Sequence, residues 1–194
     1  MKILLYTGYR TGSRSFGEWL SVELNLPYYH EPFNPKSDFK NFSIEETGDC
    51  IIKIPPDEFD YQNLKKLFDK RIILYRENIK EQSESALWAY ERQLWHNDWK
   101  VDSENSNFIS AHYTIPDEWL DKNADAIKSY SVTLQKENQV LKSLEGCLHI
   151  THEELFYSNE GIKKVEDYIG FESKSKFNKI NKLRGGRAPK KKLI

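Results

Sequence analysis

The chain has 194 residues, the size of one ordinary domain that buries about 70% of its unfolded surface. Its 5 Trp, 11 Tyr and 10 Phe supply enough apolar area to exclude a disordered chain. The opening apolar run at residues 3–6 is too short for a signal peptide or a membrane span. We therefore expect a soluble, cytoplasmic protein with a single domain over residues 1–194, and no membrane partner.

Charge is distributed unevenly along the chain. The formal net charge is -1, yet residues 173–194 hold nine of the 29 basic residues and no acidic residue. The first 172 residues therefore carry 20 basic against 30 acidic residues. Such segregation indicates that the basic C-terminal segment, residues 174–194, faces an anionic partner.

Apolar runs alternate with helical periodicities along the chain. Strands are predicted at residues 2–7, 27–29, 50–54, 71–75 and 147–150. Helices are predicted over about 16–24, near 61–68, over 78–95, over 116–146 and up to Gly170. The strand at 71–75 is apolar throughout, as a strand covered on both faces would be. This order predicts an α/β three-layer sandwich with a mainly parallel central sheet, whose ligands bind beyond the carboxyl ends of the strands.

The first strand leads into a loop with the composition of a phosphate site. Gly8 and Gly12 allow the backbone to curl so that N–H groups and a helix N-terminus face an anion. The loop also contains five side-chain donors: Arg10, Thr11, Ser13, Arg14 and Ser15. Only three residues separate the glycines and no Lys follows, so the loop is not a Walker A motif.

A second candidate site follows the strand at 71–75. Arg76 closes that strand, and Ser85 lies about two turns into the next helix. An Arg at the mouth of a strand is well suited to hold a phosphate.

Together these two segments resemble the signatures of the sulfotransferases that use 3'-phosphoadenosine 5'-phosphosulfate (PAPS). Residues 10–14 are similar to that family's Lys/Arg-Ser/Thr-Gly-Ser/Thr-Thr loop, which binds the 5'-phosphosulfate. Arg76 and Ser85 match its 3'-phosphate motif, and Asn78 with Gln82 resembles bacterial and carbohydrate-type members. The resemblance implies a P-loop NTPase-like fold, PAPS as cosubstrate and no metal. Arg10 stands where many members have Lys, and Arg14 where Thr is common.

The resemblance extends to three further segments. Residues 30–34 look like the family's Glu-Pro-Phe segment, and residues 149–155 look like its late strand ending in Tyr-Glu-Asp-Leu. Arg184, Gly185 and Arg187 look like a loose version of the late basic segment that covers the 3'-phosphate. The resemblance therefore implies that Arg184, Gly185 and Arg187 contribute to PAPS binding.

Sulfuryl transfer requires a cation near the bridging oxygen and a base for the proton of the acceptor. Arg10 suits the first role. The family position makes Glu31 the preferred base, and His30 beside it is a rival because its unperturbed pKa is near ~6.5. The acceptor is a hydroxyl or an amine, such as a carbohydrate or small metabolite, and the sequence does not identify it.

Two other functions remain open. A phosphotransferase could use the same loop for a nucleoside triphosphate, although the Walker lysine is missing. A non-catalytic module could bind an acidic partner or nucleic acid through the basic segment, with nucleic acid the less favoured of these partners.

Overall fold

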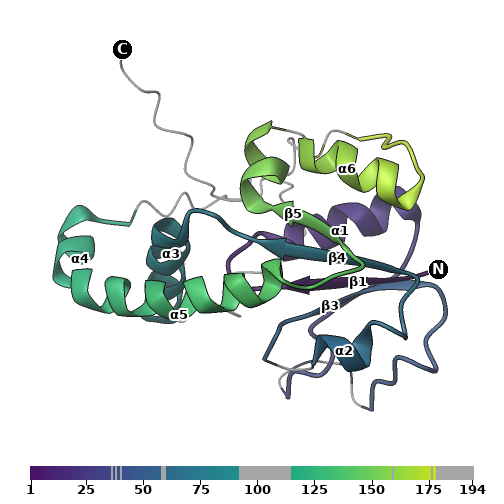
Figure 1. Cartoon of the computed structure of the whole chain (residues 1–194), viewed down its shortest axis with the longest axis horizontal. Coiled ribbons are helices and arrows are strands. Elements are labelled where there is room, and N and C mark those ends of the chain that lie inside the picture. The colour runs from purple at the N-terminus through teal and green to yellow at the C-terminus, as the bar shows by residue number, and fades with distance from the viewer. Residues whose placement is uncertain are drawn as a thin grey trace, which may run out of the picture.

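Short apolar segments pair side by side into one parallel sheet (Figure 1). The computed structural model describes residues 1–35, 37, 39, 41–57, 60–91, 115–158, 160–175 and 177. Its strands are β1 (Lys2–Thr7), β2 (Tyr28–His30), β3 (Cys50–Ile54), β4 (Lys70–Tyr75) and β5 (Leu148–Thr151). Their order in the sheet is β2-β3-β1-β4-β5, and every pairing among them is parallel. The carboxyl ends of the strands therefore lie along one edge.

Helices cover both faces of this sheet, as Figure 1 shows. One face packs against α1 (Ser13–Leu24) and α6 (Glu160–Ile169). The opposite face packs against α2 (Tyr61–Leu64) and the end of α5 (Ala124–Lys142). α3 (Ile79–Glu91) lies against α5, which follows the short α4 (Asp117–Lys122). The predicted α/β three-layer arrangement with a parallel central sheet is confirmed.

The central strand explains why the sheet is buried on both sides. Ile3 and Leu5 of β1 pack in the core that contains α1, while Leu4 and Tyr6 pack in the core that contains α2. None of the four is more than 4% exposed. Alternating side chains thus supply two cores from one continuous apolar run, the pattern expected of a parallel strand.

The predicted elements differ from the observed ones in three places. The helix expected over residues 116–146 is two helices, α4 and α5, separated at Asn123. The helix expected near 61–68 is a single turn, and a short π-helix, η1 (Glu154–Ser158), was not predicted. The predicted continuation of α3 to residue 95 lies outside the described residues. Among the helices that the structure describes, none combines the length and apolarity that crossing a membrane requires.

Candidate functional site

The loop between β1 and α1 is tightly wound. Arg10 and Gly12 both have left-handed backbones, with φ of 57° and 80°. Thr11 is fully buried, and its hydroxyl donates a 3.0 Å hydrogen bond to the Gly8 carbonyl. α1 begins directly after Gly12, which has no side chain to cap the helix. The loop and the start of α1 thus lie at the carboxyl edge of the sheet, where a phosphate cradle would use their backbone N–H groups.

Arg76 follows β4 at the same edge and is only 9% exposed. Its Nη2 donates a 2.6 Å hydrogen bond to Glu81, and its Nε lies 3.9 Å from the Glu153 carboxylate. Within the described part of the chain, Arg76 Nε has no hydrogen-bond partner. The Asn138 amide donates a 2.6 Å bond to the Arg76 carbonyl, which fixes the backbone here.

The two loops meet through a contact between their signature residues. Arg10 Nε donates a 3.0 Å hydrogen bond to the Ser85 hydroxyl on α3. Gln82, one turn earlier on α3, donates a 2.7 Å bond to the Tyr9 carbonyl. Desolvation, and next the charge of Arg76, lower the pKa of Arg10 from its ordinary value. The fold therefore places two guanidinium groups and a hydroxyl close together, an arrangement that an anion would stabilise.

The other predicted donors are spread around this centre. Ser13 is buried and Ser15 half-buried, both in the first turn of α1. Arg14 forms a 2.9 Å ion pair with Glu18 one turn along the same helix. The three remaining predicted cofactor residues, Arg184, Gly185 and Arg187, lie outside the described residues.

Glu31, the preferred base, forms an ion pair with Lys53 of β3. Burial would raise the pKa of Glu31, but the charge and hydrogen bond of the Lys53 ammonium hold it below its ordinary value. Glu31 also has a left-handed backbone, with φ of 48°, directly after β2. It is therefore an ionised carboxylate held in a fixed position.

His30, the rival base, lies beside Glu31 with its Nε2 3.7 Å from the carboxylate. Its Nδ1 lies 3.0 Å from the Tyr28 hydroxyl. Burial, and next the charge of Lys53, lower the pKa of His30 to about 4. His30 is therefore a neutral imidazole at pH 7. The structure brings His30 and Glu31 to one corner of the sheet.

Lys53 is the residue of this corner that the sequence reasoning missed. It is 4% exposed although it carries a charge, and its ammonium lies 6.0 Å from the centre of the Tyr9 ring in the β1–α1 loop. The signal was present, because a single Lys interrupts the otherwise apolar run at residues 50–54. A buried lysine requires a carboxylate partner, and Glu31 provides it.

A surface hollow of about 350 Å³ adjoins the segment after β2. The rings of Phe33, Phe39 and Phe42 line it together with the amides of Asn34 and Asn41. The Asn34 side chain also hydrogen-bonds to Glu31. A space bordered by aromatic rings and amides thus adjoins the candidate base.

No protein-family model, curated protein or solved structure matches the chain. Among the described residues, no group of three or more His, Cys, Asp or Glu side chains gathers as a metal site.

Proposed function

We propose that this protein is a cytoplasmic sulfotransferase that moves the sulfuryl group of PAPS to a hydroxyl or amine acceptor, on a P-loop-like fold. The observation that carries the proposal is the contact between Arg10 and Ser85, with buried Arg76 nearby. These three residues come from the two segments that resemble the 5'-phosphosulfate and 3'-phosphate signatures of that family. PAPS carries anionic groups at both positions, so it matches a site with an arginine in each of two loops, although Arg76 is also paired with Glu81.

Arg76 adds a physical reason to expect an anion. Its Nε is buried without a hydrogen-bond partner in the described structure, and an unmet charged donor of this kind is unfavourable. An oxyanion between Arg10 and Arg76 would reduce the repulsion between the two guanidinium groups.

The proposed chemistry assigns one role to each side of the site. The S–O bond to the phosphate breaks while an S–O bond to the acceptor oxygen forms, so negative charge grows on the phosphate that leaves. Arg10 and the N–H groups at the start of α1 stabilise that charge. Glu31, ionised and held by Lys53, accepts the acceptor proton, with His30 as its rival. The hollow beside Asn34 is the proposed entrance for the acceptor.

Ligand binding provides the test. Thermal shifts of the full chain are measured with 3'-phosphoadenosine 5'-phosphate (PAP), the product of PAPS, and in parallel with ATP plus Mg²⁺. A ligand bound by the native state alone raises the melting temperature once its concentration exceeds Kd. We expect PAP to raise it and ATP plus Mg²⁺ to raise it less. A shift with ATP plus Mg²⁺ alone would overturn the proposal in favour of a phosphotransferase.

A further inference from the structure

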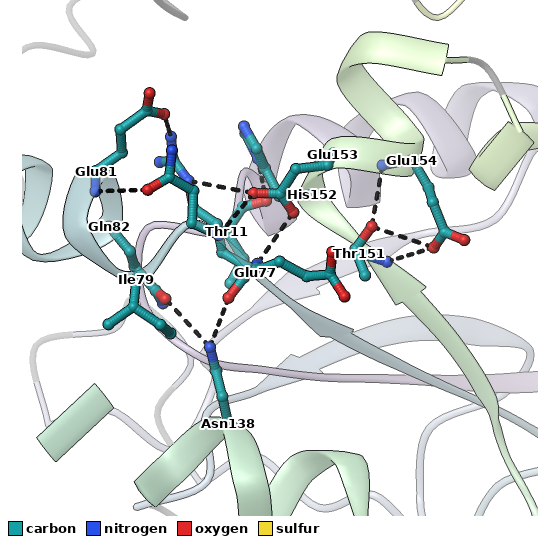
Figure 2. A network of polar contacts seen from close by, with 12 residues as sticks. Thr11, Glu77, Ile79, Glu81, Gln82, Asn138, Thr151, His152, Glu153 and Glu154 are labelled. Carbon is teal, nitrogen blue, oxygen red and sulfur yellow. Dashed lines mark hydrogen bonds and ion pairs between the residues drawn. The ribbon is translucent and has the colours of Figure 1, made fainter. Parts of the chain in front are cut away.

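The dipeptide His152-Glu153, directly after β5, contacts both loops of the site (Figure 2). His152 Nδ1 lies 2.9 Å from the Thr11 carbonyl in the β1–α1 loop. The two Glu153 carboxylate oxygens each accept a 3.1 Å hydrogen bond, from the backbone N–H groups of Glu77 and Asn78. One dipeptide therefore ties the first loop to the second.

The bond from His152 determines how one peptide group of the first loop is oriented. A carbonyl oxygen only accepts hydrogen bonds, so His152 Nδ1 carries the proton and donates it to Thr11. In a trans peptide the C=O and the following N–H point in opposite directions. Fixing the Thr11 carbonyl toward His152 thus turns the N–H of Gly12 away from β5.

The His152 ring is itself held in place by its surroundings. It is 9% exposed and stacks on Phe156 with ring centres 4.4 Å apart. Burial, and next the charge of Arg76, lower the pKa of His152 to about 4. The imidazole is therefore neutral at pH 7, and one fixed tautomer faces the loop.

We propose that His152 is a positioning residue that aims the Gly12 N–H at the bound anion through its hydrogen bond to the Thr11 carbonyl. Glu153 holds the backbone of the loop after β4 at Glu77 and Asn78. The Nδ1–H of His152 is therefore fixed relative to both loops that would hold the anionic groups of PAPS. This inference rests on the proposed function, because it assigns the orientation of the same anion site.

Two variants of the full chain and one control test the Nδ1–H donor and the aromatic ring of His152 separately. His152→Phe keeps a ring that can stack on Phe156 but has no N–H donor. His152→Asn loses the ring, yet its side-chain amide can place an N–H near the former Nδ1. The matched control is His149→Phe, because His149 bonds the Leu144 carbonyl instead of the loop.

Affinities for PAP, measured by calorimetry, should follow the donor. We expect His152→Phe to weaken binding roughly fivefold to tenfold, the worth of one well-placed hydrogen bond, and His152→Asn to retain affinity within about twofold. His149→Phe should bind like the parent protein. Melting temperatures are recorded for all variants. We expect His152→Asn, which keeps an N–H donor, to bind PAP more tightly than His152→Phe, even if the Phe variant, which keeps the ring, is the more stable.

Two results would overturn the inference while the proposed function survives. One is a His152→Phe variant that binds PAP as the parent does, and the other is equal loss in the Phe and Asn variants. If the parent does not bind PAP, the proposed function fails, and the same series is repeated with inorganic pyrophosphate. Absence of pyrophosphate binding by the parent would then overturn the positioning role as well.

Discussion

Single side chains carry the charge of this site, and Arg10 is the most direct test. We expect Arg10→Ala to weaken PAP binding about tenfold to hundredfold, because a charge-assisted contact contributes roughly 1.5 to 3 kcal/mol. Although its surroundings partly desolvate the guanidinium, Arg10 is exposed overall and lies in a loop, so the melting temperature should change little. Arg10→Lys retains the charge without the guanidinium fork, so its PAP affinity should lie between those of the parent and of Arg10→Ala. Binding and turnover of Arg10→Ala within about threefold of the parent would refute its role.

The corner formed by His30, Glu31 and Lys53 allows the two candidate bases to be ranked. We expect Glu31→Gln to reduce turnover more than His30→Gln, with PAP affinity little changed in either, since a base touches the acceptor. Turnover is measured as release of PAP in the presence of an acceptor found by screening. The opposite ranking would assign the role to His30.

Glu31→Gln also leaves Lys53 buried without its partner, and breaking such a pair costs about 3 to 5 kcal/mol. A second variant, Glu31→Gln with Lys53→Met, removes that unpaired charge. It should recover stability while turnover stays low. Recovery of both would show that Glu31 serves only the fold.

The neutral state of His152 predicts a dependence of stability on pH. Its pKa is about 4 in the folded chain and near 6.5 in the unfolded chain. The contribution of neutral His152 to the free energy of unfolding is therefore complete above pH 6.5 and is lost as the pH falls from 6.5 toward 4. Because Asn does not titrate, the difference in unfolding free energy between the parent and His152→Asn should shrink by about 2 kcal/mol from pH 7 to 4.5. Urea titrations measure it, and a constant difference would contradict the assignment.

At the scale of elements, the turn from β1 into α1 depends on Gly12. A Cβ at Gly12 would lie 2.4 Å from the Phe156 ring, and the backbone there has φ of 80°. Gly12→Ala should therefore lower the melting temperature by roughly 4 to 8 °C and weaken PAP binding. The matched control is Gly48→Ala, since a Cβ there meets nothing within 4 Å. Differential scanning calorimetry that found equal melting temperatures for the two variants would argue against this strain.

The strands β1, β3 and β4 were predictable because each is a mainly apolar run long enough to be recognised locally. β1, β3 and β4 lie within one residue of their predicted bounds. The break between α4 and α5 at Asn123 was not predictable, because the apolar stripe continues through it at helical spacing. Helical periodicity reports which face is buried and does not show where one helix stops and another begins.

The site was predictable as two motifs but not as one constellation. Glycines and basic residues after β1 and β4 indicated anion binding, and the parallel order implied one shared edge. The contact between Arg10 and Ser85, and that of His152 with Thr11, join residues far apart in the chain. No local pattern specifies such pairings.

At the scale of the whole molecule, the basic C-terminal segment lies beside the β1–α1 loop at Phe177. Phe177 is 2% exposed, with its ring centre 5.2 Å from that of Phe156, the ring over Gly12. Backbone N–H groups of Lys174 and Ser175 bond the carboxylate of Glu23 on α1. Phe177 therefore lies close to the proposed anion site.

Truncation tests whether the segment reads the 3'-phosphate. Deleting residues 188–194 should change binding little. Deleting from residue 183 onward should weaken PAP at least tenfold, and weaken adenosine 5'-phosphosulfate, which lacks the 3'-phosphate, far less. Calorimetry with both ligands gives the comparison. Equal loss for the two ligands, or no loss for either, would show that the segment has another role.

The parallel sheet also has a consequence for how the chain reaches its fold. Each strand pairs with a partner distant in sequence: Leu4 of β1 lies opposite Ile52 and Arg71, and Ile73 of β4 lies opposite His149. Hairpins, which form in microseconds, join no two of these strands. On the ribosome β1 is made first and keeps both edges open until β3 and β4 have emerged. Its apolar run is therefore the surface that a nascent chain must protect from aggregation.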